Sequence, residues 1–293
     1  MRRLIIRPGA IGDTILALPA MESLRADYTE VWVASQNVPL IRFADRALSI
    51  ASTGLDSLGI PGIEAPARTL ERLRGFDSIV SWYGANREEF REAVSQFPFT
   101  FLRALPEEGA GLHATDYFLR QVETWRGGTS GVNRADGGIW PGSRAALVQK
   151  SFSQPVAPSI PCRRGGGGFV AMHPFSGSAK KNWPLERFRA VAAKLRGPVE
   201  WCAGPEEKLD DAVRIADLYE LAEWLASARL YIGNDSGITH LAAAVGTPAI
   251  ALFGPSDPAI WGPRGERVRI LRAMPMEEIQ PEAVVAAAEA MEE

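Results

Sequence analysis

The sequence predicts an α/β protein of two halves, each a parallel sheet with helices on both faces. The chain has 293 residues, about two domains of common size. Short apolar runs rich in β-branched residues alternate with segments of helical periodicity, as in strands joined by crossover helices. Between about residues 140 and 168 the periodicity disappears and prolines and glycines gather, so the boundary between the halves is expected there.

The first half begins with a predicted strand at residues 3–7, which stops at a Pro-Gly pair. Apolar residues at helical spacing after Asp13 predict a helix, with Pro19 as an expected kink. Short apolar runs and an amphipathic segment then predict strands at 30–34 and 78–82 and a helix at 113–125.

The same alternation restarts after residue 168. The predicted domains are residues 1–160 and 161–293, and the last helix is a candidate to pack back on the first domain. Two such halves leave a cleft, where ligands of these folds usually bind. The pattern predicts strands at 169–173, 199–202, 230–233 and 249–253, and helices at 185–195, 206–216, 218–228, 236–245 and from Met276 onward.

Composition excludes several classes of protein. Hydrophobic residues make up 46% and charged residues 23% of the chain, which excludes collagen-like, coiled-coil and wholly disordered proteins. A net charge of -3 gives no dense basic patch for nucleic acid. No apolar run approaches the roughly 20 residues of a membrane-spanning helix. Pro8 and Gly9 interrupt the first apolar stretch, so no secretory signal is expected and the location is expected to be cytoplasmic.

Neither a disulfide nor a metal site is expected. Cys162 and Cys202 stand alone, without a CxxC pair, and are expected to be buried small side chains. The residues around His173, Asp235 and His240 lack HExxH or paired-cysteine spacing. A serine hydrolase is also excluded, because no GxSxG elbow occurs.

The first candidate constellation is GAIGD at residues 9–13, between a predicted strand and a predicted helix. Gly9 and Gly12 let the backbone approach a ligand closely, and a helix start offers unpaired N–H groups. Neither the dinucleotide fingerprint nor the P-loop is present. Asp13 has two interpretations. It is the N-cap of its own helix, which these five residues alone favour, or a general base that accepts the proton of an acceptor hydroxyl.

The second constellation is HPFSGSAKKNWP at residues 173–184. Donors gather in this loop as in phosphate sites: Ser176, the Gly177 amide, Ser178 and Lys181. A solvated polar loop with Trp183 as a packing anchor explains the same residues equally well.

The third constellation is GNDSGITHLAAA at residues 233–244, where a strand ends and a helix begins. Asp235 or Ser236 can cap this helix, and Ser236 with the Gly237 amide can meet a phosphate at its positive end. His240 follows Ser236 by one turn on the same face, where a buried, hydrogen-bonded histidine is the alternative. A fourth stretch, residues 252–258, is expected to form another wall of the same cleft.

Three stretches resemble the signature stretches of glycosyltransferase family 9, the ADP-heptose:lipopolysaccharide heptosyltransferase family. They are RPGAIGDTILALPAMESLR, HPFSGSAKKNWPLERF and GNDSGITHLAAAVGTPAIALFGPSDPAIWGPRG, in the family's order across both halves. The helix that starts at His113 is a weaker likeness. Two departures fall in the first half: the chain is shorter than many members, and residues 76–90 lack the typical acidic and aromatic pattern. Another glycan or a lipid-linked acceptor therefore stays open.

The resemblance implies a GT-B architecture, with two facing Rossmann-like domains and a cleft between them. The first domain would hold the acceptor and the second the nucleotide sugar, expected to be ADP-heptose, for an inverting transfer with no metal and no cofactor. Asp13 would be the catalytic base, and Lys181 the catalytic cation on the donor diphosphate. Gly9 and Gly12 would form the acceptor loop. The donor site would comprise Ser176, Gly177, Ser178, Lys181, Glu206 (or Glu207) at the ribose, Leu218 at the adenine, Asp235, Ser236, Gly237 and His240.

Two alternatives to the heptosyltransferase function remain: a nucleotide-sugar epimerase of GT-B-like fold, and a degenerate member that binds nucleotide without transfer. The expected partners are a nucleotide sugar and a glycan or lipid-linked acceptor, with no nucleic acid. A lipid-linked acceptor would bring the protein to the inner face of the inner membrane. Arg2, Arg3, Trp82 and Arg87 are the candidates for that contact by position alone.

Overall fold

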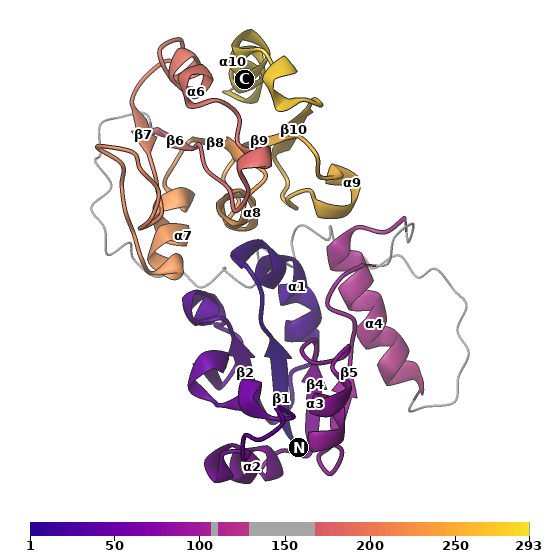
Figure 1. Cartoon of the computed structure of the whole chain (residues 1–293). Coiled ribbons are helices and arrows are strands. Elements are labelled where there is room, and N and C mark those ends of the chain that lie inside the picture. The colour runs from indigo at the N-terminus through magenta and orange to yellow at the C-terminus, as the bar shows by residue number, and fades with distance from the viewer. Residues whose placement is uncertain (107–110, 129–167, 293) are drawn as a thin grey trace. The chain divides into compact units, whose positions relative to one another are not determined.

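A computed structural model describes residues 1–106, 111–128 and 168–292, which belong to two compact units coloured from indigo to magenta and from salmon through orange to yellow (Figure 1). The first unit lies within Met1–Gly138 and the second within Ile139–Glu293. The boundary predicted between residues 160 and 161 lies outside the described residues, as does Cys162.

The first unit is a five-stranded parallel sheet in the order β3-β2-β1-β4-β5. This is the strand order of the first five strands of a Rossmann sheet, and the order in which the strands are added changes direction between β1 and β4. Its strands are β1 (Arg2–Arg7), β2 (Tyr28–Val33), β3 (Arg46–Ser49), β4 (Ser78–Ser81) and β5 (Phe99–Phe101). Its helices are α1 (Ile11–Ser23), α2 (Ala67–Arg74), α3 (Glu88–Ala93) and α4 (Ala114–Gly128), with 3-10 turns at Ser35–Leu40, Ile50–Ser52 and Leu55–Ser57.

The second unit is also a five-stranded parallel sheet, in the order β10-β9-β8-β6-β7. Counted from its own first strand, the order is 2-1-3-4-5, so its change of direction lies between β6 and β8. Its strands are β6 (Val170–His173), β7 (Val199–Trp201), β8 (Leu230–Asn234), β9 (Ala249–Phe253) and β10 (Val268–Arg272). Its helices are α6 (Leu185–Ala192), α7 (Leu218–Ala226), α8 (Gly237–Ala244), α9 (Pro258–Trp261) and α10 (Pro281–Glu292), with 3-10 turns at Ala179–Lys181 and Met276–Glu278.

The central strands are apolar because helices cover both faces of each sheet. Leu4, Ile5 and Ile6 of β1 are fully buried, and all five residues of β8 and of β9 are buried. The edge strands β3, β5, β7 and β10 are only partly buried. Their weaker apolar signal explains why three of them, β3, β5 and β10, are missing from the sequence prediction.

The predicted helix at residues 206–216 is wrong, because this segment is a loop without helix. The Arg214 guanidinium donates to the carbonyls of Gly204, Glu207 and Leu209 at 2.8, 3.0 and 2.9 Å. The Arg214 side chain is therefore hydrogen-bonded to carbonyls that a helix would pair with its own backbone N–H groups. Asp211 has a φ of 58°, which a helix does not allow.

The helix that follows begins at Leu218, where the Asp217 carboxylate accepts the N–H groups of Tyr219 and Glu220 as an N-cap. The last helix, α10, packs against α6 and β9 of its own unit through Val284, Ala287 and Ala288.

None of the helices in the described part of the chain is long and apolar enough to cross a membrane. Two of the side chains expected to meet a membrane surface are buried, since Arg3 is 7% and Trp82 is 2% exposed. The Arg3 guanidinium donates to the carbonyl of Leu24 instead of facing outward. The expectation of a membrane contact through Arg3 and Trp82 is therefore wrong.

Candidate functional site

Polar residues follow the two strands that flank the change of direction in the second sheet, and one constellation follows β1 in the first. Residues 9–13 follow β1, residues 174–184 follow β6, and Ser236 follows β8. In open α/β sheets, ligands bind outside the carboxyl ends of the strands at this point. The sheet topology of each unit thus favours the same loops that the sequence singles out.

Asp13 lies in the first turn of α1 but is not its N-cap. The helix starts at Ile11, Ala10 is the capping position, and Asp13 is the third helical residue. Its Oδ2 accepts the Ala10 N–H at 3.0 Å, which satisfies a backbone donor just before the helix. The N-cap interpretation is therefore wrong in position, and the partly exposed carboxylate is held at the carboxyl end of β1.

Gly9 is required by the position of Asp13. Its φ is 150°, and a Cβ there would lie 2.9 Å from the Asp13 Cβ, closer than such atoms approach. The buried Asn37 amide donates to the Gly9 carbonyl at 3.0 Å and to the Thr14 hydroxyl at 2.7 Å, which ties the loop to α1. Gly12, the second residue of α1, is partly exposed. No sequence signal links Asn37 to this loop, 28 residues earlier.

A buried cation lies below this loop. Arg7, the last residue of β1, donates to the Ala104 carbonyl at 3.2 Å, and its guanidinium lies 4.8 Å from the centre of the Phe118 ring. Burial lowers the pKa of Arg7, and the negative charge of Asp13 partly opposes that change. The first unit therefore offers a positioned carboxylate with a cation behind it.

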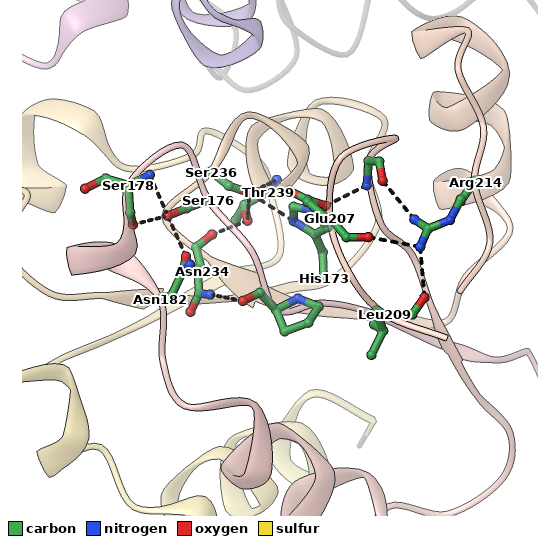
Figure 2. Close-up of polar contacts among 12 residues, drawn as sticks. His173, Ser176, Ser178, Asn182, Glu207, Leu209, Arg214, Asn234, Ser236 and Thr239 are labelled. Atoms are coloured by element: carbon green, nitrogen blue, oxygen red, sulfur yellow. Dashed lines mark hydrogen bonds and ion pairs between the residues drawn. The ribbon is translucent and has the colours of Figure 1, made fainter. Parts of the chain in front are cut away.

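In the second unit, Asn234, which Figure 2 labels, holds both ends of the loop after β6. Its fully buried amide donates to the Pro174 carbonyl at 2.8 Å and accepts the Trp183 N–H at 3.1 Å. The Trp183 indole is the expected packing anchor, buried in the core and donating to the Ile279 carbonyl at 3.1 Å. This loop is held as one piece against the end of β8.

The cation expected in this loop is paired. The Lys181 ammonium donates to the Asp235 carboxylate at 2.8 Å, and Asp235 is buried while Lys181 is 33% exposed. Within the loop, the Ser176 hydroxyl lies 2.8 Å from the Ser178 carbonyl and 2.7 Å from Asn182 Oδ1. Gly177 and Ser178 are exposed at the tip of the loop.

Ser236 is the N-cap of α8, and its hydroxyl accepts the Thr239 N–H at 3.4 Å. Gly237 is partly exposed as the first residue of the helix, which places its amide at the positive end. His240 lies one turn further along α8 and is buried. Ser236 directly follows Asp235, the partner of Lys181, at the end of β8.

A buried histidine joins Ser236 to a glutamate, as Figure 2 shows. His173 Nε2 lies 3.0 Å from Glu207 Oε2, and His173 Nδ1 lies 3.4 Å from Ser236 Oγ. Partial burial alone would raise the pKa of Glu207. The hydrogen bonds from His173 and from the Gly204 N–H outweigh burial and hold that pKa below its usual value. From the sequence, His173 is considered only as a metal ligand, although His173 is the first residue of the polar stretch 173–184.

Of the two glutamates expected near a ribose, Glu207 is engaged with His173 and Gly204, whereas the Glu206 side chain is exposed. Leu218, expected at the adenine, is the first residue of α7 and is 5% exposed. Among the residues that the structure describes, no three His, Cys, Asp or Glu side chains gather as a possible metal site.

Known proteins resemble this chain over both units. The model of "Glycosyltransferase family 9 (heptosyltransferase)" matches residues 138–287. Lipopolysaccharide heptosyltransferase 3 of Escherichia coli is 25% identical, in an alignment that covers 86% of this chain and 83% of the relative.

Two solved structures from E. coli share the fold. ADP-heptose lps heptosyltransferase II has a TM-score of 0.69 at 16% identity, covering 99% of this chain and 98% of its own. Heptosyltransferase WaaC with ADP has a TM-score of 0.65 at 17% identity, covering 99% and 100%. These likenesses confirm the predicted α/β fold of GT-B type.

We predict that Gly9→Ala lowers the free energy of unfolding by about 1–3 kcal/mol, because a side chain there is strained and meets Asp13. Urea denaturation measures the change. Gly127→Ala is the matched control, since a Cβ there meets nothing within 4 Å, and it should be neutral or stabilising. Equal stability of the two variants would show that the loop does not need glycine at position 9.

Proposed function

The chain belongs to glycosyltransferase family 9, the heptosyltransferases, and from that membership we propose a specific reaction for it. It transfers a heptose or a related sugar from an ADP-sugar to a hydroxyl of a lipopolysaccharide-core-like glycan. The transfer inverts the anomeric carbon and uses no metal. One observation carries the proposal: the three family stretches each follow the carboxyl end of a strand beside the change of direction in its sheet.

We assign the nucleotide sugar to the second domain, residues 161–293. The diphosphate would contact the tip of the β6 loop, at Ser176, Gly177 and Ser178, and the amide of Gly237. Lys181 supplies the full positive charge, and Asp235 holds its ammonium at the end of β8. The exposed Glu206 is the better candidate for the ribose, because the Glu207 carboxylate is occupied. Leu218 at the adenine and His240 beneath the helix start complete the assignment.

We assign the acceptor to the first domain, residues 1–160, with Gly9 and Gly12 in the loop that approaches it. Asp13 is the base, because its carboxylate is partly exposed and held by the Ala10 amide. In the reaction the acceptor oxygen attacks the anomeric carbon, the bond from that carbon to the diphosphate breaks, and the acceptor proton passes to Asp13. ADP leaves with the bonding electrons, and a single displacement inverts the configuration.

Metal independence rests on the charges of the chain itself. A departing diphosphate needs cationic and N–H donors where its charge develops, and Lys181 with the first turn of α8 supplies both. No separate cofactor takes part, because the nucleotide sugar carries the transferred group.

We place the reaction in the cytoplasm. A lipid-linked acceptor would hold the enzyme at the inner face of the inner membrane. Arg2 is exposed and Arg87 is partly exposed, so they remain the candidates for this contact.

We predict that Asp13→Asn lowers the transfer rate about a hundred- to ten-thousand-fold, because a positioned base contributes that much. The asparagine oxygen can still accept the Ala10 N–H, so the loop keeps its shape. The assay follows heptose transfer from ADP-heptose to a heptose-free lipopolysaccharide core. ADP affinity, measured by calorimetry, is the control and should not change. Full activity in this variant would reduce Asp13 to a structural role.

We predict that Lys181→Ala weakens ADP binding about tenfold or more and leaves adenosine binding unchanged, because a charged hydrogen bond contributes about 1.5–3 kcal/mol. Calorimetry with both ligands measures the difference. The variant also frees the Asp235 carboxylate, so Lys181→Ala combined with Asp235→Asn should bind ADP better than Lys181→Ala alone. Equal losses for ADP and adenosine would place Lys181 away from the diphosphate.

A further inference from the structure

The chain from Glu207 through His173 to Ser236 determines where protons lie beside the proposed diphosphate site. Because the pKa of Glu207 is lowered, its carboxylate is ionised and can only accept. The proton between the two side chains must therefore be on His173 Nε2, 3.0 Å from Glu207 Oε2. A neutral imidazole then has a lone pair on Nδ1, the nitrogen that faces Ser236.

The Ser236 hydroxyl has one proton and two inward acceptors. Thr239 Oγ1 donates to the Asn234 carbonyl, so it can only accept from Ser236 Oγ at 3.2 Å and from the Tyr231 hydroxyl at 3.0 Å. His173 Nδ1, when unprotonated, is the other acceptor. With a neutral histidine, the Ser236 proton is drawn inward and the hydroxyl turns its lone pairs toward an incoming anion.

A second proton on His173 reverses this arrangement. Nδ1–H then donates to Ser236 Oγ, which leaves Thr239 Oγ1 as the one inward acceptor, and an incoming phosphate oxygen competes with it for the Ser236 proton. The cationic ring also adds positive charge beneath the start of α8, where the helix amides already favour an anion.

We propose that His173 is a positioning residue for the donor, which takes up a proton when the diphosphate binds and thereby turns the Ser236 hydroxyl into a donor. The proposal rests on the proposed function, because it assumes that the diphosphate binds at Ser236. Glu207 compensates the charge of the protonated ring.

The other ionisable groups around His173 keep their charge through the neutral range. Burial raises the pKa of the Cys202 thiol, which follows β7. Burial also raises the pKa of Tyr231, in β8, far above its usual value. Both groups stay neutral while Glu207 stays charged. A histidine is the side chain type that changes charge between about pH 5 and 8.

Three charged side chains lie beside this set. Asp235, which follows β8, pairs with Lys181 from the β6 loop, and the Arg214 guanidinium donates to the carbonyl of Glu207. The sign of the pH dependence follows from the proposal: ADP binds better to the protonated ring, so its affinity rises as the pH falls.

Histidine-labelled protein tests the proposal by NMR, because the chain has only three histidines. The signal missing from a His173→Asn spectrum identifies the ring. Its titration from about pH 5.5 to 8.5 is followed without ligand, with ADP and with adenosine. We expect ADP to raise the midpoint by about one pH unit, a tenfold difference in ADP affinity between the two ring states, and adenosine to leave it in place.

The Ser236→Ala variant distinguishes the hydroxyl relay, meaning the reorientation of the Ser236 hydroxyl by His173, from simple attraction between the ring and the diphosphate. This variant should lose most of the rise in midpoint, whereas Ser236→Thr, which keeps a hydroxyl, should retain it. An equal rise in wild type and Ser236→Ala would overturn the relay. Glu207→Gln should lower the midpoint in every state, because it removes the charge that compensates the ring.

The outcomes also separate this inference from the proposed function. If calorimetry on the same samples shows that ADP binds but the His173 midpoint does not move, only the positioning role fails. If ADP does not bind, the proposed function is overturned, and the positioning role with it.

Discussion

The site of the second unit depends on the hydrogen bonds of the buried Asn234 side chain. The side-chain amide of Asn234 holds Pro174 and Trp183, the two ends of the loop after β6, and the backbone carbonyl of Asn234 accepts the Thr239 hydroxyl at the start of α8. Two segments about 60 residues apart in the chain are thus fixed to the same strand end. Buried polar groups are costly unless all are paired, so this network favours one arrangement of the loop. The positions of Lys181 and Ser236 follow from it.

The first unit uses the same device. The Asn37 amide donates to the carbonyl of Gly9 after β1, as the Asn234 amide donates to the carbonyl of Pro174 after β6. In both units the first strand is therefore followed by a loop whose backbone is held by a buried asparagine from elsewhere in the chain. Each held loop carries one side chain of the proposed reaction, Asp13 in the first unit and Lys181 in the second.

Much of this could be predicted from the sequence, because the central strands are continuous apolar runs and the loops after them have distinctive polar residues. The failures have physical causes. Edge strands such as β10 are partly exposed and lack the apolar signal. In the segment expected as a helix at 206–216, the Arg214 side chain donates to the carbonyls of residues 204, 207 and 209 in place of backbone amides. Asn37 and His173 act through partners distant in sequence, to which no local spacing points.

Calorimetric titration of the purified protein with ADP, UDP, GDP and NAD tests the central claim most directly, because the base preference identifies the donor before any acceptor is known. The account predicts that ADP binds at least tenfold more tightly than the other three, a difference of about 1.4 kcal/mol. Tighter binding of UDP or GDP would contradict an ADP-sugar donor while leaving the fold unchanged, and no binding of any nucleotide would contradict the transferase itself.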